Sequence, residues 1–358
     1  MKHHGVSFIA LALALLLAEL ALRFFAPIYT AGIQQAYEYD PTLGVRLRKS
    51  VHEFRLTDHL EEIRSNRIGT ADFRDDYSGY DDLIFALGDS YTQGTGLAAD
   101  QSYPIQLDLL LNRDSAGRYQ KRIAVINLGL AAFGAEQSLL ALKVYARAIG
   151  KPAACLYLGS ENDFDDDLLF RSGHRHRHVV HGSPTWGRFA PALMRIGNLQ
   201  LVLRVKLLVA SRRHESLRRD GAARSSRQSP ANFYLQPGAD AAPSPRSTRH
   251  RSVAEQQWPA IQSIVDACRA RGARVVVAWS AIPGTTGSYE WLKTKADQSS
   301  IPFNDWYPHV ASIRTAMPAL PLANPHSGGH YRGWVNTEIA RGFAASLAPP
   351  KPPASELQ

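Results

Sequence analysis

The chain alternates between short, continuous runs of apolar residues and longer segments in which apolar residues recur every three to four positions. The short runs are rich in branched and aromatic residues and each ends in Gly or Ser, which predicts buried strands over residues 82–88, 122–129, 153–159 and 273–280. The longer segments predict helices over residues 102–112, 135–150 and 253–272. Strands that alternate with helices favour an α/β fold, with a central parallel sheet covered by helices on both faces.

The N-terminus has a different pattern. After a short basic start, the run from Val6 to Leu22 is apolar except for Ser7 and Glu19, and Arg23 follows it. This pattern indicates a signal peptide or a membrane anchor. Aromatic bulk after the run leaves no clean small-x-small cleavage site, so we favour an uncleaved anchor and expect the rest of the chain to be exported.

These patterns divide the chain into five parts. We expect an anchor or signal peptide, an extension packed on the core, a catalytic-size α/β domain in two pieces, a basic insertion and a disordered tail. Their boundaries are 1–25, 26–80, 81–170 with 251–348, 171–250, and 349–358.

The basic character of the chain is local. Residues 171–251 hold 16 Lys or Arg against three acids, a net charge of +13, whereas the whole chain carries +9. The insertion is therefore a candidate surface for anionic lipid head groups or for an acidic polysaccharide, and a plain soluble loop is the third interpretation. Nucleic acid is the least fitting partner for an exported chain.

The sequence gives no strong metal or disulfide signal. Cys155 and Cys268 match no metal spacing, and we interpret them as small buried residues. The histidines of the insertion alternate with arginines, which favours an exposed basic loop. The acidic run at 161–167 favours a solvated loop over a cation site.

Three polar residues follow separate predicted strands or the last loop. Ser90 follows the first strand, Asn162 follows the third, and His330 precedes a C-terminal helical segment. A hydroxyl becomes a nucleophile when a base takes its proton, and the resulting oxyanion needs hydrogen-bond donors. Because parallel strands end at one edge of a sheet, this set could meet there. Taken alone, Ser90 is better explained as a helix N-cap, and Asn162 and His330 in order favour the nucleophile instead.

The order of these residues resembles the blocks of the SGNH hydrolase superfamily, the GDSL-type esterases and lipases. The matching residues are Gly88-Asp89-Ser90-Tyr91 with Gly94, Asn127 with Gly129, Asn162-Asp163, and His330-Tyr331. Residues 14–25, 37–48 and 65–76 are similar to the leader of membrane-anchored bacterial members. The resemblance implies a flavodoxin-like three-layer fold, with a periplasmic catalytic domain on a single-pass inner-membrane anchor, or a secreted one if the anchor is cleaved.

The resemblance also implies roles for individual residues. Ser90 would be the nucleophile and His330 the base. The backbone N–H of Ser90, a backbone N–H of the second block and the Asn162 side chain would form the oxyanion hole. The second-block glycine is replaced here by Ala132, with Gly129 and Gly134 as alternatives on either side. No metal or organic cofactor is required.

Two further departures affect these roles. Glu161 stands where a glycine usually precedes the asparagine, and we expect its carboxylate to point away from the oxyanion site. The aspartate expected two or three residues before the histidine is missing, because those positions hold Gly328 and Ser327. His326 is an alternative base, but only His330 gives the family's helix register, with Asn336 six residues later.

The function that this resemblance implies is a serine esterase. We expect it to remove O-acyl groups, most plausibly acetyl, from a cell-envelope or extracellular glycan through an acyl-serine. The first alternative is an O-acyltransferase, which shares the nucleophile chemistry and differs in how water is excluded. The second is a catalytically weak glycan-binding or assembly factor, which the missing aspartate would favour.

Overall fold

A parallel sheet forms the centre of the molecule. The computed structural model describes residues 2–26, 35–56, 60–113, 122–172, 180–182, 184, 186–205, 208, 245–324 and 329–348. The sheet strands are β5 (Asp82–Gly88), β6 (Ile123–Asn127), β7 (Ala154–Gly159) and β8 (Arg274–Trp279), in the order β6-β5-β7-β8. Nearly all their side chains are buried, as expected for strands covered on both faces.

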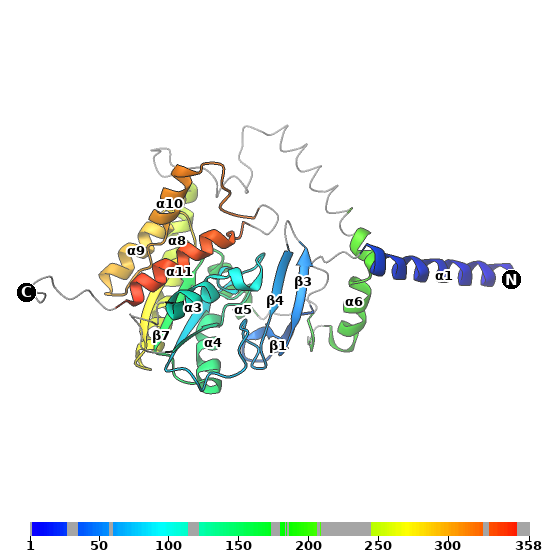
Figure 1. Cartoon of the computed structure of the whole chain (residues 1–358), viewed down its shortest axis with the longest axis horizontal. Coiled ribbons are helices and arrows are strands. Elements are labelled where there is room, and N and C mark those ends of the chain that lie inside the picture. Colours follow the sequence, from blue (N-terminus) through cyan, green and yellow to red (C-terminus); the bar gives the residue numbers. More distant parts are fainter. Residues whose placement is uncertain are drawn as a thin grey trace, which may run out of the picture.

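The strand order fixes which face each helix covers. The chain moves one way across the sheet from β5 to β6 and the opposite way from β6 to β7 and β8. Right-handed crossovers therefore place α3 (Tyr103–Arg113) on one face, and α4 (Ala135–Ala148) and α8 (Pro245–Arg269) on the other. Accordingly, α3 packs against the C-terminal α11 (Gly333–Leu347), and α4 packs against α8 (Figure 1). The predicted flavodoxin-like three-layer α/β/α fold is confirmed.

Shorter elements lie between and after the strands and helices of the sheet. They are the helices α2 (Ser90–Gln93), α5 (Asp163–Arg171), α6 (Ala190–Gly197), α9 (Ser288–Gln298) and α10 (Tyr307–Ala316), and the 3₁₀ turns at Ala99–Gln101 and Gly187–Phe189. The predicted strands agree with the observed ones to within two residues at each end. The helix predicted from 253 begins earlier, at Pro245, a residue type that the first turn of a helix tolerates.

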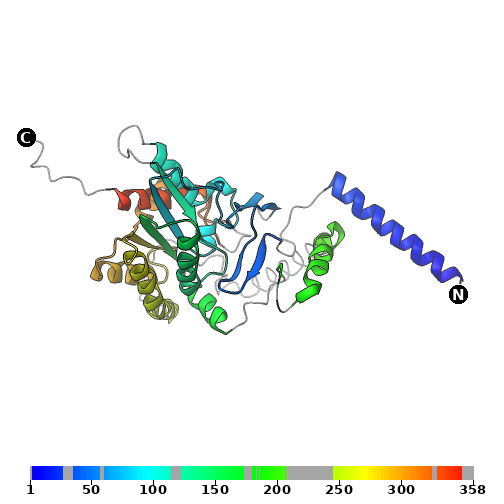
Figure 2. The same cartoon turned by 90° about the horizontal axis from the view of Figure 1, so that it is seen from below.

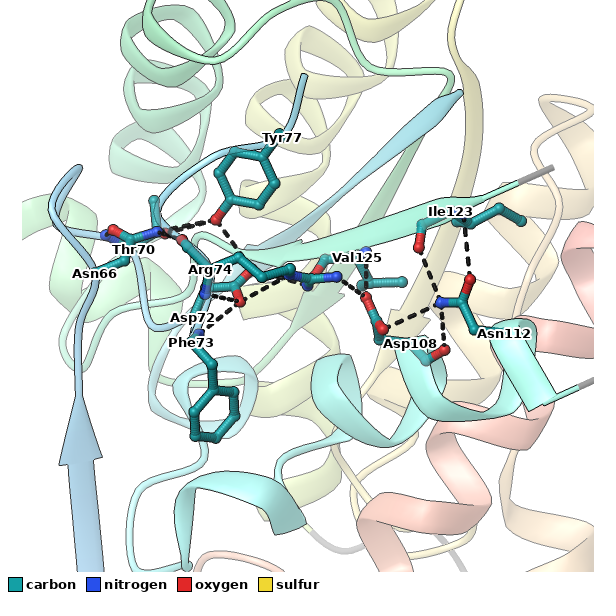
Figure 3. Close-up of polar contacts among 10 residues, drawn as sticks. All are labelled: Asn66, Thr70, Asp72, Phe73, Arg74, Tyr77, Asp108, Asn112, Ile123 and Val125. Carbon is teal, nitrogen blue, oxygen red and sulfur yellow. Dashed lines mark hydrogen bonds and ion pairs between the residues drawn. The ribbon is translucent and has the colours of Figure 1, made fainter. Parts of the chain in front are cut away.

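Residues 35–56 and 60–80 contain two hairpins and a polar segment that joins them to the sheet. The hairpins are β1 (Tyr37–Asp40) with β2 (Gly44–Leu47), and β3 (His52–Leu56) with β4 (Leu60–Arg64). The polar segment reaches the core through Arg74, which donates to Val125 O at 2.8 Å and to Asp108 Oδ2 at 2.6 Å (Figure 3). The extension is thereby held to β6 and α3.

The two cysteines form a disulfide. Cys155 lies on β7 and Cys268 on α8, with their Cα atoms 6.3 Å apart. Both are fully buried, as expected, but the interpretation of two unpaired residues was wrong. The pairing depends on the α8 crossover placing residues 113 positions apart side by side, which spacing alone does not reveal.

The N-terminal helix α1 (Lys2–Phe25) extends away from the sheet in both views (Figure 1, Figure 2). Its segment Ser7–Phe25 has a mean hydropathy of 2.2, and most of its side chains are exposed. It is the one helix within the described part of the chain that is long and apolar enough to cross a membrane.

Candidate active site

Ser90 lies at the carboxyl end of β5, where the sequence next to it forces a sharp turn. A Cβ on Gly88 would lie 2.5 Å from Leu158 O, and the φ of Gly88 is +147°, so this position requires glycine. Asp89 is the N-cap of α2, and its Oδ1 accepts the Tyr91 N–H at 2.8 Å. The alternative in which Ser90 caps the helix is therefore wrong, since Ser90 is the first helical residue.

His330 reaches Ser90 from the last loop before α11. Its Nε2 lies 2.7 Å from Ser90 Oγ. The backbone at His330 is held by the Asn324 N–H, which donates to His330 O at 2.9 Å, and the Tyr91 ring lies 4.9 Å from the imidazole, centre to centre. The expected helix register is present, because Asn336 Oδ1 accepts the Tyr103 N–H and ties α11 to α3.

Asn162 lies at the start of α5, beyond the end of β7. Its amide nitrogen donates to Asp166 Oδ2 at 2.8 Å and lies 3.3 Å from Asp89 Oδ2. Both amide hydrogens therefore face carboxylates, and an oxyanion would have to replace Asp166 as an acceptor. Burial raises the pKa of Asp166 to about 6, so near neutral pH this competing group is mainly charged.

The second-block loop offers one exposed amide. The Gly129 N–H donates to Asn127 Oδ1 at 3.0 Å, and Gly134 is buried against Asp167 at the start of α4. Ala132 is exposed, has a left-handed φ of +64°, and its N–H has no acceptor among the described residues. A non-glycine residue in this conformation is strained, a feature often found at functional sites. Of the three candidates, Ala132 has the amide best suited to bind an anion.

The positions around the missing aspartate are only partly described. His326, Ser327 and Gly328 lie outside the described residues. Among the described carboxylates, that of Asp89 interacts electrostatically with His330 and lies 3.4 Å from Ser90 Oγ. Glu161 accepts a hydrogen bond from Ser288 Oγ at 2.7 Å, so its carboxylate is engaged at the start of α9.

Ser160, which the sequence reasoning missed, lies at the centre of a buried acidic cluster. Its Oγ is 2.7 Å from Asp89 Oδ2, 2.8 Å from Asp163 Oδ1 and 2.6 Å from Asn162 Oδ1. A hydroxyl donates once, so a second of these contacts can be a hydrogen bond only if an aspartate carries a proton. Its position directly after a buried strand is the only sequence signal for this residue.

Burial and charge decide which aspartate holds that proton. Burial raises the pKa of Asp89 and of Asp163, and the charge of Asp89 raises the pKa of Asp163 further. Each carboxylate has two further donors, the Tyr91 N–H and the Asn162 amide for Asp89, and the Tyr157 hydroxyl and the Ser160 N–H for Asp163. Asp89 differs in that the charge of His330 also lowers its pKa. We therefore assign the proton to Asp163 and the negative charge to Asp89, next to Ser90 and His330.

The described residues of the insertion contribute little to this site. Of its clustered histidines, His174, His176 and His178 lie outside the described residues, and His181 Nε2 contacts Arg48 at 3.1 Å near the hairpins. Within the described ranges, no group of three or more His, Cys, Asp or Glu side chains is arranged to hold a metal ion.

Several solved structures are similar to this chain. A G-D-S-L family protein from Desulfitobacterium hafniense is 12% identical, with 74% of this chain and 99% of that chain covered and a TM-score of 0.40. Esterase EstA from Pseudoalteromonas is 12% identical, with 75% and 97% covered and a TM-score of 0.38. A lipolytic G-D-S-L family member from Veillonella parvula is 9% identical, with 74% and 97% covered and a TM-score of 0.36.

No family model and no curated protein matches the chain.

Proposed function

We propose that this chain is a serine ester hydrolase that acts through an acyl-Ser90 intermediate. The observation that carries the proposal is the 2.7 Å contact between Ser90 Oγ and His330 Nε2 at the carboxyl edge of the sheet. A serine hydroxyl in contact with an imidazole is the arrangement in which a neutral base can take the serine proton.

The reaction then has two halves. Ser90 Oγ attacks the ester carbonyl while His330 Nε2 takes its proton, and the N–H groups of Ser90 and Ala132 hold the oxyanion. As the intermediate collapses, His330 returns the proton to the leaving alcohol and the acyl group stays on Ser90. Water then attacks the acyl-serine with His330 as base, which releases the carboxylic acid and restores the hydroxyl.

The oxyanion donors in this scheme are preorganised amides. The N–H groups of Ser90 and Ala132 have no acceptor among the described residues. Asn162 would add a third donor once its amide turns from Asp166 to the oxyanion. Such donors act where charge develops, which makes them more valuable to the transition state than to the bound ester.

A glycan ester is the substrate class that the surroundings support best. A groove of about 560 Å³ lies beside the segment that holds His330, and it is lined mainly by polar side chains and one tryptophan. These residues are Asp100, Gln101, Gln106, Asn324, Arg332 and Trp334, with Leu97, Gly333 and Thr337. Amide, carboxyl and guanidinium groups suit sugar hydroxyls, and an indole edge suits a sugar face. Acetyl is the acyl group that we propose.

The N-terminal helix supports an exported, membrane-anchored location. Its segment Ser7–Phe25 is apolar and long enough to span a bilayer. The Cys155–Cys268 disulfide fits the same location, because disulfides persist in oxidising compartments such as the periplasm.

The test uses the full chain in detergent with p-nitrophenyl acetate and with an acetylated glycan. We expect hydrolysis that Ser90→Ala lowers about 10³-fold or more, and fluorophosphonate labelling that the variant abolishes. Ser263→Ala is the matched control, because that exposed hydroxyl bonds only its own helix, at Pro259 O. Acetyl transfer that depends on an acceptor glycan would favour the acyltransferase. Glycan binding without turnover or labelling would favour the binding factor.

A further inference from the structure

The apolar N-terminal helix contains one buried carboxylate. Glu19 is 7% exposed, whereas apolar side chains on the same helix, such as Leu13 and Leu17, are more than half exposed. Glu19 is six residues from Phe25, the end of the apolar segment, which places it about 9 Å inside that segment at 1.5 Å per residue. A carboxylate at this depth in a bilayer requires partners.

The insertion supplies two of those partners, and α1 itself supplies a third. The backbone N–H groups of Gln200 and Leu201 donate to the two Glu19 oxygens at 2.9 and 3.0 Å, and Arg23 Nε donates at 2.7 Å. A helical segment begins at residue 200, and its first N–H groups lack partners within the helix. Glu19 therefore caps this segment from the side of α1. A second tie, from Arg204 to Ala26 O, joins the two segments near the end of α1.

These contacts fix the depth of the capped segment. If Ser7–Phe25 spans a bilayer, residues 200 and 201 lie at the level of Glu19, which is below the end of the span. The neighbouring surface is apolar, because four large side chains are more than half exposed. They are Phe189, Ile196, Val205 and Leu208. Water is a poor environment for such a surface, and lipid is a suitable one.

We propose that residues 186–205, with Leu208, form a second membrane-contacting element that lies in the interfacial layer of the bilayer against α1. Its apolar side chains enter the lipid. Arg188 and Arg195, on the same element, can extend to anionic head groups. The occupant of this surface is thus a lipid bilayer, and Glu19 sets the depth of the element. The proposal rests on the membrane anchor proposed above for α1, and it is independent of the esterase chemistry.

The test places a fluorophore on the apolar surface of the full chain. Because Cys155 and Cys268 are paired, Ile196→Cys adds a single reactive thiol, which is labelled with an NBD dye in phosphatidylcholine vesicles with a fifth of phosphatidylglycerol. Gln298→Cys, exposed on α9, is the matched control. We expect nitroxide-labelled lipid to quench the dye at 196 several times more strongly than at 298, and aqueous iodide to show the reverse.

Three outcomes would overturn the proposal. Protein that does not float with vesicles would overturn both the anchor and the interfacial element. Protein that floats, but carries a dye at 196 as open to iodide as the dye at 298, would overturn the element alone. A dye at 196 that is shielded from both quenchers, increasingly so at higher protein-to-lipid ratio, would assign the surface to a second copy of the chain.

A further variant tests the role of Glu19. Glu19→Leu keeps α1 apolar and removes the cap, so we expect flotation to persist while lipid quenching at 196 falls at least twofold. Unchanged quenching in this variant would show that Glu19 does not set the depth of the element. Thermal unfolding followed by circular dichroism verifies that each labelled variant is folded.

Discussion

The two sides of the Ser90–His330 contact are built in different ways. Ser90 is positioned by residues within four places of it in the chain: Gly88 makes the turn, Asp89 caps α2, and Gly94 ends it in a left-handed conformation. His330 is positioned partly by distant parts of the chain, because the Tyr91 ring lies against its imidazole and Asn336 ties the following α11 to Tyr103 of α3. The nucleophile therefore depends on local backbone geometry, whereas the proposed base depends on several tertiary contacts.

The largest expected loss of activity comes from removing either side of the Ser90–His330 contact. Ser90→Ala and His330→Gln should each lower kcat/KM for p-nitrophenyl acetate about 10⁴-fold, and the double variant should be no worse, because residues that act as a unit are not additive. Initial rates of the three proteins measure this. Multiplied losses in the double variant would mean that Ser90 and His330 act independently.

A smaller effect is expected at the turn before the nucleophile. Gly88→Ala places a Cβ 2.3 Å from Thr92 Oγ1 and 2.5 Å from Leu158 O, so the strand end must shift. We expect a loss of about 1–3 kcal/mol in the free energy of unfolding. We expect about 100-fold lower activity from a misplaced Ser90. Gly284→Ala is the control, because it shares a positive φ but has open space around its Cβ. Equal losses in both variants would assign the effect to φ strain alone.

A single change near His330 should lower activity less than the change at Gly88 does. Asn324→Ala removes the side-chain bond to Gly96 O at 3.2 Å and keeps the main-chain bond to His330 O. We expect a loss in kcat/KM of about tenfold or less, since one net hydrogen bond contributes roughly 1 kcal/mol. Steady-state kinetics measure it. A loss as large as that of Gly88→Ala would mean that one residue also governs the position of His330.

The smallest predicted effect is a gain. Above pH 6 Asp166 is charged and holds the Asn162 amide, so Asp166→Ala should free this donor and raise kcat about threefold at pH 8. The gain should shrink below pH 6, where wild-type Asp166 is already protonated. Asp165→Ala, exposed on the same helix, is the control. A pH-independent gain, or an equal gain in the control, would contradict this role for Asp166.

The sequence was sufficient for the sheet because buried parallel strands are continuous apolar runs. The run at 82–88 coincides with β5, and the other three differ by at most two residues at an end. The contact of Ser90 with His330 could be predicted because the serine follows a strand end and the histidine precedes the last helix, and Asn162 at the next strand end lies beside Asp89. The hydrogen bonds that these residues make could not be predicted from the sequence. The turn of Asn162 toward Asp166, and the three acceptors around Ser160, depend on side-chain directions that no spacing encodes.

Because of the disulfide, the basic insertion is not the only covalent link between the two halves of the α/β domain. Cys155 and Cys268 stand on either side of it in the chain, so the two halves of the α/β domain are joined covalently by a second route. A protease that cuts anywhere between residues 172 and 245 would leave one molecule, which separates into two fragments only after reduction. Residues 172–245 could therefore be cleaved or replaced without releasing the strand and helices that carry His330 from those that carry Ser90.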